Sequence, residues 1–152
     1  MPDIRKIANR IQAEIMVEVR KKYSKKVIEH WQHPKNWGIM NDADGYGKIT
    51  GPCGDTMEIS IRVKDNTIVN CTFDTDGCGT TIACGSIITE MTIGKSIHYA
   101  KSITQETVLQ FCGGLPEEDR HCAVLGVDTM QKAIHDYEAI RDESWKKMYR
   151  KV

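Results

Sequence analysis

Apolar residues recur every three or four positions near the start of the chain, between residues 3 and 22. This spacing aligns side chains on one face, so it predicts an amphipathic helix. The apolar positions are Ile4, Ile7, Ala8, Ile11, Ile15 and Val19. The simplest interpretation is that this stripe packs on the body of the domain, and the alternative is contact with a second copy or another partner. We therefore divide the chain into an N-terminal amphipathic helical extension, residues 1–22, and one domain, residues 23–152.

A second short helix is predicted from Ser24 to about His33, because Pro34 has no N–H to donate into a further turn. The glycine, Asp and Asn residues of the segment 36–47 then indicate a loop.

The hydrophobic pattern changes to a period of two between residues 47 and 75, which predicts strands with one buried face. The alternating apolar positions of the first long strand are Met57, Ile59, Ile61 and Val63. Asp65 and Asn66 supply a hairpin turn. The chain returns over residues 68–75 with Val69, Cys71 and Phe73 on one face, so Cys71 is expected to be a small core residue.

Helical spacing returns after residue 79. A helix is predicted over residues 80–92 with Cys84 on its apolar stripe, and two short helices over 96–101 and 104–111. The last helix is predicted over 122–150, with a buried stripe of Ala123, Val127, Met130, Ile134 and Tyr137. Together these elements predict an α+β fold: a small antiparallel three-stranded sheet with helices packed on one face, a long C-terminal helix and an extra N-terminal amphipathic helix.

The composition fits one compact domain with a core, since 40% of the 152 residues are hydrophobic. Lys and Arg number 21, as do Asp and Glu, so the net charge of zero gives no electrostatic reason to expect nucleic acid or an acidic membrane surface as a partner. No apolar run approaches the ~20 residues of a membrane span, and the first residues have neither a signal-peptide nor a transit-peptide pattern. We expect a cytoplasmic protein.

Six cysteines could form three disulfides. In a chain without an export signal and with enough length for a core, reactive or metal-bound thiols are the better interpretation. Cys84 is expected in the core, with an auxiliary thiol role left open because it lies near Cys78 in the sequence, and Cys112 has no assignment.

Side chains that bind soft or borderline metals occur at three separated points: Cys53-Gly54-Asp55, Cys78 between two glycines, and the pair His121-Cys122. Thiolates and imidazole suit zinc or iron–sulfur units, whereas a carboxylate is a weaker partner for the same metals. A site built from this set should bind something that it can release. Three loops converging at one end of the small sheet would make it shallow and partly exposed.

Local geometry suggests how these side chains are presented. Cys53 and Asp55, two residues apart in extended chain, would point the same way. Cys122 would lie at a helix N-terminus, whose partial positive charge, together with the neighbouring His121, should lower the pKa of the thiol.

The order Cys-Gly-Asp, Gly-Cys-Gly, His-Cys resembles the IscU-type iron–sulfur cluster assembly scaffolds, a domain also found at the N-terminus of NifU-like proteins. The likeness covers roughly residues 23 to 140. Besides the ligands it includes the segments Tyr23 to His30, His33-Pro34-Lys35-Asn36, Thr89-Glu90, Gly94-Lys95-Ser96 and Leu115-Pro116.

The resemblance implies a scaffold, rather than an enzyme or a permanent cofactor carrier, on which a two-iron two-sulfur (2Fe-2S) cluster is built and then handed on. Cys53, Asp55, Cys78, His121 and Cys122 would form the pool of ligands for iron, zinc or the transient cluster, with zinc in the apo or as-purified form. Asp55 would keep the cluster labile.

The resemblance also implies partners. A cysteine desulfurase would donate sulfur as a persulfide, with Cys122 as the first choice of acceptor and Cys53 as the second. Acceptor apoproteins and an electron donor such as ferredoxin complete the set. The apolar stripe of the first 22 residues, which extend beyond the usual start of the family, adds a homodimer as an alternative to packing on the domain. Many bacterial members carry Leu-Pro-Pro-Val-Lys before the His-Cys pair as the handle for an Hsp70-type chaperone. This chain has Leu115-Pro116-Glu117-Glu118-Asp119 instead, so chaperone-assisted release is in doubt.

Two other functions would use the same residue types. A zinc-dependent persulfide sulfurtransferase fits less well, because that branch lacks the histidine before the last cysteine and carries an insertion between the second and third cysteines. A structural zinc-binding interaction module needs only four ligands, fewer than the five candidates in this chain.

Overall fold

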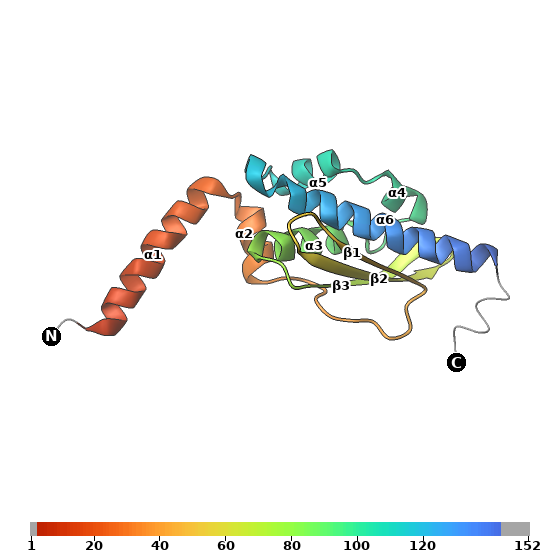
Figure 1. The fold of residues 1–152 in the computed structure, drawn as a ribbon, viewed down its shortest axis with the longest axis horizontal. Coiled ribbons are helices and arrows are strands. Elements are labelled where there is room, and N and C mark those ends of the chain that lie inside the picture. The colour runs from red at the N-terminus through yellow and green to blue at the C-terminus, as the bar shows by residue number, and fades with distance from the viewer. Residues whose placement is uncertain (1–2, 144–152) are drawn as a thin grey trace.

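The structure, a computed structural model, describes residues 3–143 and contains a three-stranded sheet with helices packed on one face (Figure 1). The strands are β1 (Gly45–Thr50), β2 (Thr56–Lys64) and β3 (Thr67–Thr75). The helices are α1 (Ile4–Lys22), α2 (Lys25–Gln32), α3 (Gly79–Thr92), α4 (Ile97–Ser102), α5 (Gln105–Cys112), the 3-10 turn η1 (Glu117–Asp119) and α6 (Arg120–Asp142). The predicted α+β class, sheet, long C-terminal helix and extra N-terminal helix are confirmed.

The strands lie side by side in sequence order, each antiparallel to its neighbour. In β2 the predicted alternation holds, because Met57, Ile59 and Ile61 are fully buried. Asp65 and Asn66 form the β2–β3 turn with positive φ. β1 begins at Gly45, so the loop before it ends earlier than the sequence suggested.

Val69 does not lie on the buried face of β3, where the sequence placed it. Arg62 pairs with Asn70 and Val63 pairs with Ile68, so Val69 is an extra residue in a β-bulge. The bulge turns the side chain of Val69 outward, where it is 44% exposed, and Ile68 takes the buried position. Cys71 and Phe73, beyond the bulge, are buried as predicted.

Two glycines of β1 allow α6 to lie directly against the strand. A Cβ atom on Gly45 would overlap the carbonyl oxygen of Ala133, and one on Gly47 would lie 2.5 Å from the carbonyl oxygen of Thr129. Beyond the end of β1, Gly51 faces the side chain of Leu125. The N-terminal end of α6 is therefore placed beside the β1–β2 connection.

The short helices begin at residues whose side chains cap them. Ser24 caps α2, Ser96 caps α4, and Thr104 caps α5 with a capping box. Gly113, with a φ of 84°, ends α5 in the left-handed conformation. The short helices predicted from the sequence are thus confirmed to within a residue or two.

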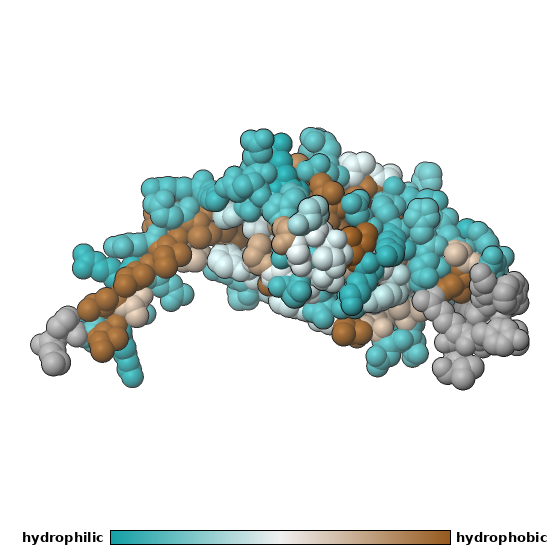
Figure 2. All heavy atoms as spheres, viewed as in Figure 1, coloured by the Kyte–Doolittle hydropathy of each residue, from teal (hydrophilic) through white to brown (hydrophobic). Residues whose placement is uncertain are grey.

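The first helix extends away from the rest of the domain (Figure 1). Its apolar stripe is visible as a brown band in Figure 2, and Ile4 is 81% exposed. The expectation that the stripe packs on the body of the domain is wrong. The reason is that the contacts recorded between α1 and the domain, Lys22 with Glu118 and Met16 with Gln32, lie in the C-terminal half of the helix.

The last helix starts two residues before the predicted position, because η1 leads directly into α6. Its predicted stripe is buried except for Tyr137, which is half-buried. The part of the prediction from residue 144 to 150 lies outside the described residues. Within residues 3–143, no helix has the length and apolar character needed to cross a membrane.

Candidate metal centre

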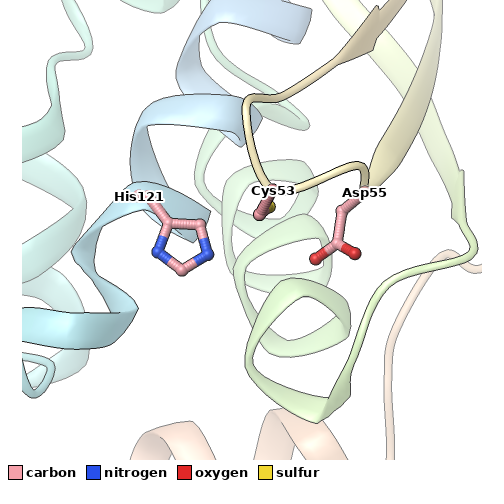
Figure 3. A group of neighbouring side chains, drawn as sticks. All are labelled: Cys53, Asp55 and His121. Carbon is pink, nitrogen blue, oxygen red and sulfur yellow. The ribbon is translucent and has the colours of Figure 1, made fainter.

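Two segments that are far apart in the sequence meet at one end of the sheet. The β1–β2 turn contributes Cys53 and Asp55, and the first turn of α6 contributes His121. One ligand atom from each, the Sγ of Cys53, a carboxylate oxygen of Asp55 and a ring nitrogen of His121, lie within 4.8 Å of one another (Figure 3). The structure thus brings three of the five candidate ligands into one group.

A tight turn positions Cys53 and Asp55. The N–H of Gly51 donates to the carbonyl oxygen of Asp55 at 2.8 Å, and the N–H of Gly54 donates to the carbonyl oxygen of Gly51 at 3.0 Å. Gly54 has a φ of 92°, a conformation that residues with a side chain rarely adopt. The extended chain assumed from the sequence is therefore wrong at this point, and a turn brings the two side chains together.

Cys78 is the N-cap residue of α3 and is exposed. Partial burial opposes its charged form. The backbone N–H of Thr81, the hydroxyl of the same residue and the N–H of Thr80 together outweigh that effect and lower the pKa of the Cys78 thiol below its ordinary value. The start of α3 therefore favours the thiolate, the form of cysteine that binds metals.

Cys122 lies in the first turn of α6, with its Sγ 3.6 Å from Nε2 of His121. The lowered pKa expected for this thiol is wrong. Cys122 is fully buried, and burial raises its pKa to about 11, aided by the nearby Cys78, Asp119 and Asp55. The physical reason is that η1 continues directly into α6, so Cys122 is packed inside the domain and not presented at an open helix end.

Thr81 connects the remaining ligands to this group, and sequence reasoning missed it. Its Oγ1 lies 3.1 Å from Oδ2 of Asp55, 3.3 Å from Sγ of Cys122 and 3.7 Å from Sγ of Cys78. A threonine three residues after the N-cap of a helix was the available signal, because that position faces back toward the cap. Through Thr81 and His121, all five candidate ligands belong to one connected cluster.

The other cysteines lie in the core. Cys71, Cys84 and Cys112 are buried, which confirms the core positions predicted for the first two. Burial raises the pKa of Cys84 well above its ordinary value, and Cys122, Cys112 and Cys78 add to this effect. All six cysteines are free, so the interpretation of the cysteines as a disulfide framework is not supported.

The donor set suits zinc or iron, because it combines thiol sulfur and imidazole nitrogen with a single carboxylate. Cys53, Cys78 and His121 are exposed, Asp55 is half-buried and Cys122 is buried. The cluster is therefore closed on the side of Cys122 and open to solvent on the side of Cys53 and His121. Such an arrangement can bind a metal-containing group and also admit a ligand from another molecule.

Comparison with known proteins identifies the family of the chain. The family model described as "NifU-like N terminal domain" matches residues 22–144. "Iron-sulfur cluster assembly scaffold protein IscU 1" of Archaeoglobus fulgidus is 47% identical over 116 residues, 76% of this chain and 76% of that protein. "Iron-sulfur cluster assembly scaffold protein IscU" of Haemophilus influenzae is 40% identical over 122 residues, 77% of this chain and 96% of that protein.

A solved structure supports the fold alone. The N-terminal part of a nitrogen-fixing NifU-like protein from Brucella abortus superposes with a TM-score of 0.61 at 18% sequence identity. The superposition covers 76% of this chain and 94% of that chain.

Proposed function

Because the chain belongs to the NifU-like N-terminal domain family, we propose that it is a scaffold on which a 2Fe-2S cluster is assembled and then transferred to acceptor apoproteins. The observation that carries the proposal is the approach of Cys53, Asp55 and His121 to within 4.8 Å at the open side of a thiol-rich cluster. Iron and sulfur are the cargo of this site, and the protein provides ligands without catalysing a reaction of its own.

The ligand pool consists of Cys53, Asp55, Cys78, His121 and Cys122, with zinc able to occupy the same donors in the absence of cluster. The thiolates hold soft metal firmly. Asp55 holds it less firmly, since a carboxylate is a harder donor, and it leaves a position that a cysteine of an acceptor can enter.

Sulfur reaches the site as a persulfide from a cysteine desulfurase. Cys122 is the first choice of acceptor and Cys53 the second. The exposure of Cys53 supports direct delivery to it, whereas delivery to Cys122 requires a local opening of the site, because Cys122 is fully buried. Persulfide sulfur must also be reduced to sulfide, so the proposal includes an electron donor such as ferredoxin.

The segment before α6 has contacts within the chain. Glu118 forms a 2.7 Å ion pair with Lys22, and Asp119 accepts a hydrogen bond from the hydroxyl of Tyr23. Because these contacts already engage the segment within the chain, they support a scaffold that does not use it to bind a chaperone.

Anaerobic reconstitution with ferrous iron, cysteine, a cysteine desulfurase and dithiothreitol as the source of electrons tests the proposal. The expected product is a reddish-brown protein that contains iron and sulfide in equal amounts and transfers both to an apo-ferredoxin. Cys53→Ser should lose the cluster, and Cys71→Ala, which alters a core thiol, should retain it. A protein that stays colourless and keeps tightly bound zinc under these conditions would instead support the sulfurtransferase or structural zinc module.

A further inference from the structure

The hydroxyl of Thr81 lies between three of the candidate ligands. Its Oγ1 is 3.1 Å from a carboxylate oxygen of Asp55, 3.3 Å from the sulfur of Cys122 and 3.7 Å from the sulfur of Cys78. We propose that Thr81 is a positioning residue that holds these three side chains ready for metal before any metal binds. The inference deepens the proposed function and rests on it for its biological meaning.

The hydrogen-bonding capacity of a hydroxyl matches this environment. A threonine hydroxyl has one proton to donate and two lone pairs that accept. The proton of Thr81 can be donated to the carboxylate of Asp55 or to the thiolate of Cys78, and a lone pair can accept from the thiol of Cys122. Because Thr81 is fully buried, water does not compete for these contacts.

The backbone fixes the position of Thr81. Its Cα belongs to the first turn of α3, and its side chain packs on Gly77. A Cβ atom on Gly77 would lie 2.7 Å from Cβ of Thr81 and 2.8 Å from its Oγ1. Any side chain at position 77 would therefore push the hydroxyl away from the ligands, so glycine at that position is required for the arrangement.

Zinc affinity, measured by competition with a chromophoric chelator, tests the inference without any cluster assay. Thr81→Val keeps the shape of the side chain and removes the hydroxyl, so zinc should bind about 10- to 100-fold more weakly, the usual effect of losing an outer-shell partner of metal ligands. Thr81→Ser keeps the hydroxyl and should bind nearly as the unaltered protein does. Thr129→Val is the matched control, because Thr129 is equally buried but donates to the carbonyl oxygen of Leu125.

Two outcomes overturn the inference: unchanged zinc affinity in folded Thr81→Val, or equal weakening in Thr81→Ser and Thr81→Val. If Thr81→Val does not fold, Thr81→Ala provides the same comparison with the serine variant. The zinc test of Thr81 and the cluster test of the proposed function can fail independently of each other. A chain that never accepts a cluster contradicts the function even if Thr81→Val weakens zinc binding, and the converse result contradicts only the role of Thr81.

An independent observation concerns α1, which precedes the matched residues 22–144. It is 19 residues long and has no buried residue, whereas most of the stability of helices in proteins comes from the packing of an amphipathic face. Ile7, Ile11 and Ile15 are between 43% and 55% exposed. Figure 2 shows a band of apolar surface along this helix. We infer that α1 pairs with α1 of a second copy of this chain in antiparallel orientation.

The charge pattern of α1 is complementary to itself only in the antiparallel orientation. If two helices cross at Ile11, Ala8 of one faces Ile15 of the other. On one flank, Arg10 then meets Glu14 of the second copy and Asp3 meets its Lys21. A two-fold axis repeats each contact. In a parallel pair this flank would instead face the opposite flank of the second helix, which carries Arg5 and Gln12 and no carboxylate.

The charge pattern of α1 also argues against a lipid surface as the binding partner of its apolar stripe. Helical spacing places Glu18 within the apolar stripe, seven residues after Ile11, and Glu14 at its border, where anionic headgroups would repel both carboxylates. In the single chain Arg10 and Glu14 form an exposed contact of 4.0 Å, so both groups can change partners at little cost when two helices meet.

Sedimentation velocity of the full chain, with a chelator and a reductant present to exclude metal-bridged and disulfide-linked species, tests the pairing. The chain should form a concentration-dependent dimer, and Ile11→Glu should be monomeric with unchanged zinc affinity. Ala13→Glu, at an exposed position on the opposite face of α1, is the matched control and should remain dimeric. Arg10→Glu should weaken the dimer, and adding Glu14→Arg should restore it.

A chain that stays monomeric up to its solubility limit overturns the inference. A chain that is monomeric in solution but binds vesicles of anionic phospholipid also overturns it and identifies a membrane surface as the occupant.

Discussion

The imidazole Nε2 of His30 lies 2.9 Å from Oε2 of Glu90, which joins α2 to α3 inside the domain. His30 is only 4% exposed, and its Nδ1 lies 2.7 Å from the hydroxyl of Ser86. Lys35 reaches the other carboxylate oxygen of Glu90 at 2.9 Å. Because α3 carries Cys78 at its N-terminus, this network helps to set the position of one candidate ligand.

The buried histidine makes stability sensitive to mild acid. Burial lowers the pKa of His30, and Lys35 adds to this effect, although Glu90 and Glu29 oppose it. The unfolded chain therefore binds a proton at this histidine at higher pH than the folded chain does, so stability falls as pH drops below about 6.5. Urea unfolding between pH 7 and pH 5 should show this loss. His30→Gln should flatten that dependence, and His98→Gln, at an exposed histidine, should leave it unchanged; equal slopes in all three proteins would contradict the prediction.

The contact between β1 and α6 should be intolerant of a methyl group. In Gly47→Ala the new Cβ would meet the carbonyl oxygen of Thr129 at 2.5 Å, so we expect a loss of about 1–3 kcal/mol in the free energy of unfolding. Gly51→Ala is the matched control, because its Cβ would meet Leu125 at an ordinary 3.7 Å. Urea denaturation checks both variants. Similar stabilities for the two would show that α6 adapts to β1 more freely than its backbone contact indicates.

Thiol labelling should separate the cysteines by exposure. Cys53 and Cys78 should react with N-ethylmaleimide in the folded protein, and the four buried cysteines should react only after unfolding in urea. Zinc should protect both exposed thiols, which mass spectrometry of the labelled peptides would detect. Labelling of Cys122 as fast as that of Cys53 would contradict this order and would show that the structure around Cys122 opens readily.

Asp55→Ala should slow the transfer of a reconstituted cluster to an apo-ferredoxin. The variant loses the weakest donor of the ligand pool, and with it the position at which an acceptor thiolate can enter. The measurement is the rate of transfer under anaerobic conditions. Asp42→Ala, which removes an exposed carboxylate from the loop before β1, should transfer at the unaltered rate. Faster or unchanged transfer from Asp55→Ala would be inconsistent with this role of the carboxylate.

Periodicity was sufficient to predict the sheet and the order of the helices, because each element buries one face and shows it in the spacing of its apolar residues. It failed at Val69, where a single bulged residue changes which side chains point inward. It also failed for the surroundings of α1, since an apolar stripe predicts a partner without specifying whether the partner belongs to the same domain.

The candidate ligands could be predicted from the sequence because few residue types bind soft metals. The burial and the neighbours of each ligand could not be predicted in this way. The burial of Cys122 depends on η1, a 3-10 turn with no hydrophobic period of its own, and this burial reverses the expected direction of the pKa. Thr81 escaped notice because threonine is common inside helices, and only the fold places its hydroxyl between Asp55 and two cysteines.

The glycine contacts of β1 with α6 also determine which part of the pocket can move. The backbones of β1 and α6 are in direct contact, so we expect the two elements to move as one rigid unit. His121 and Cys122 belong to this unit because they lie in the first turn of α6. The hinge is then the short turn at Gly54, which carries Cys53 and Asp55 and has open space around it. Release of the bound group would then require movement of only a few residues of this turn, while the rest of the domain stays in place.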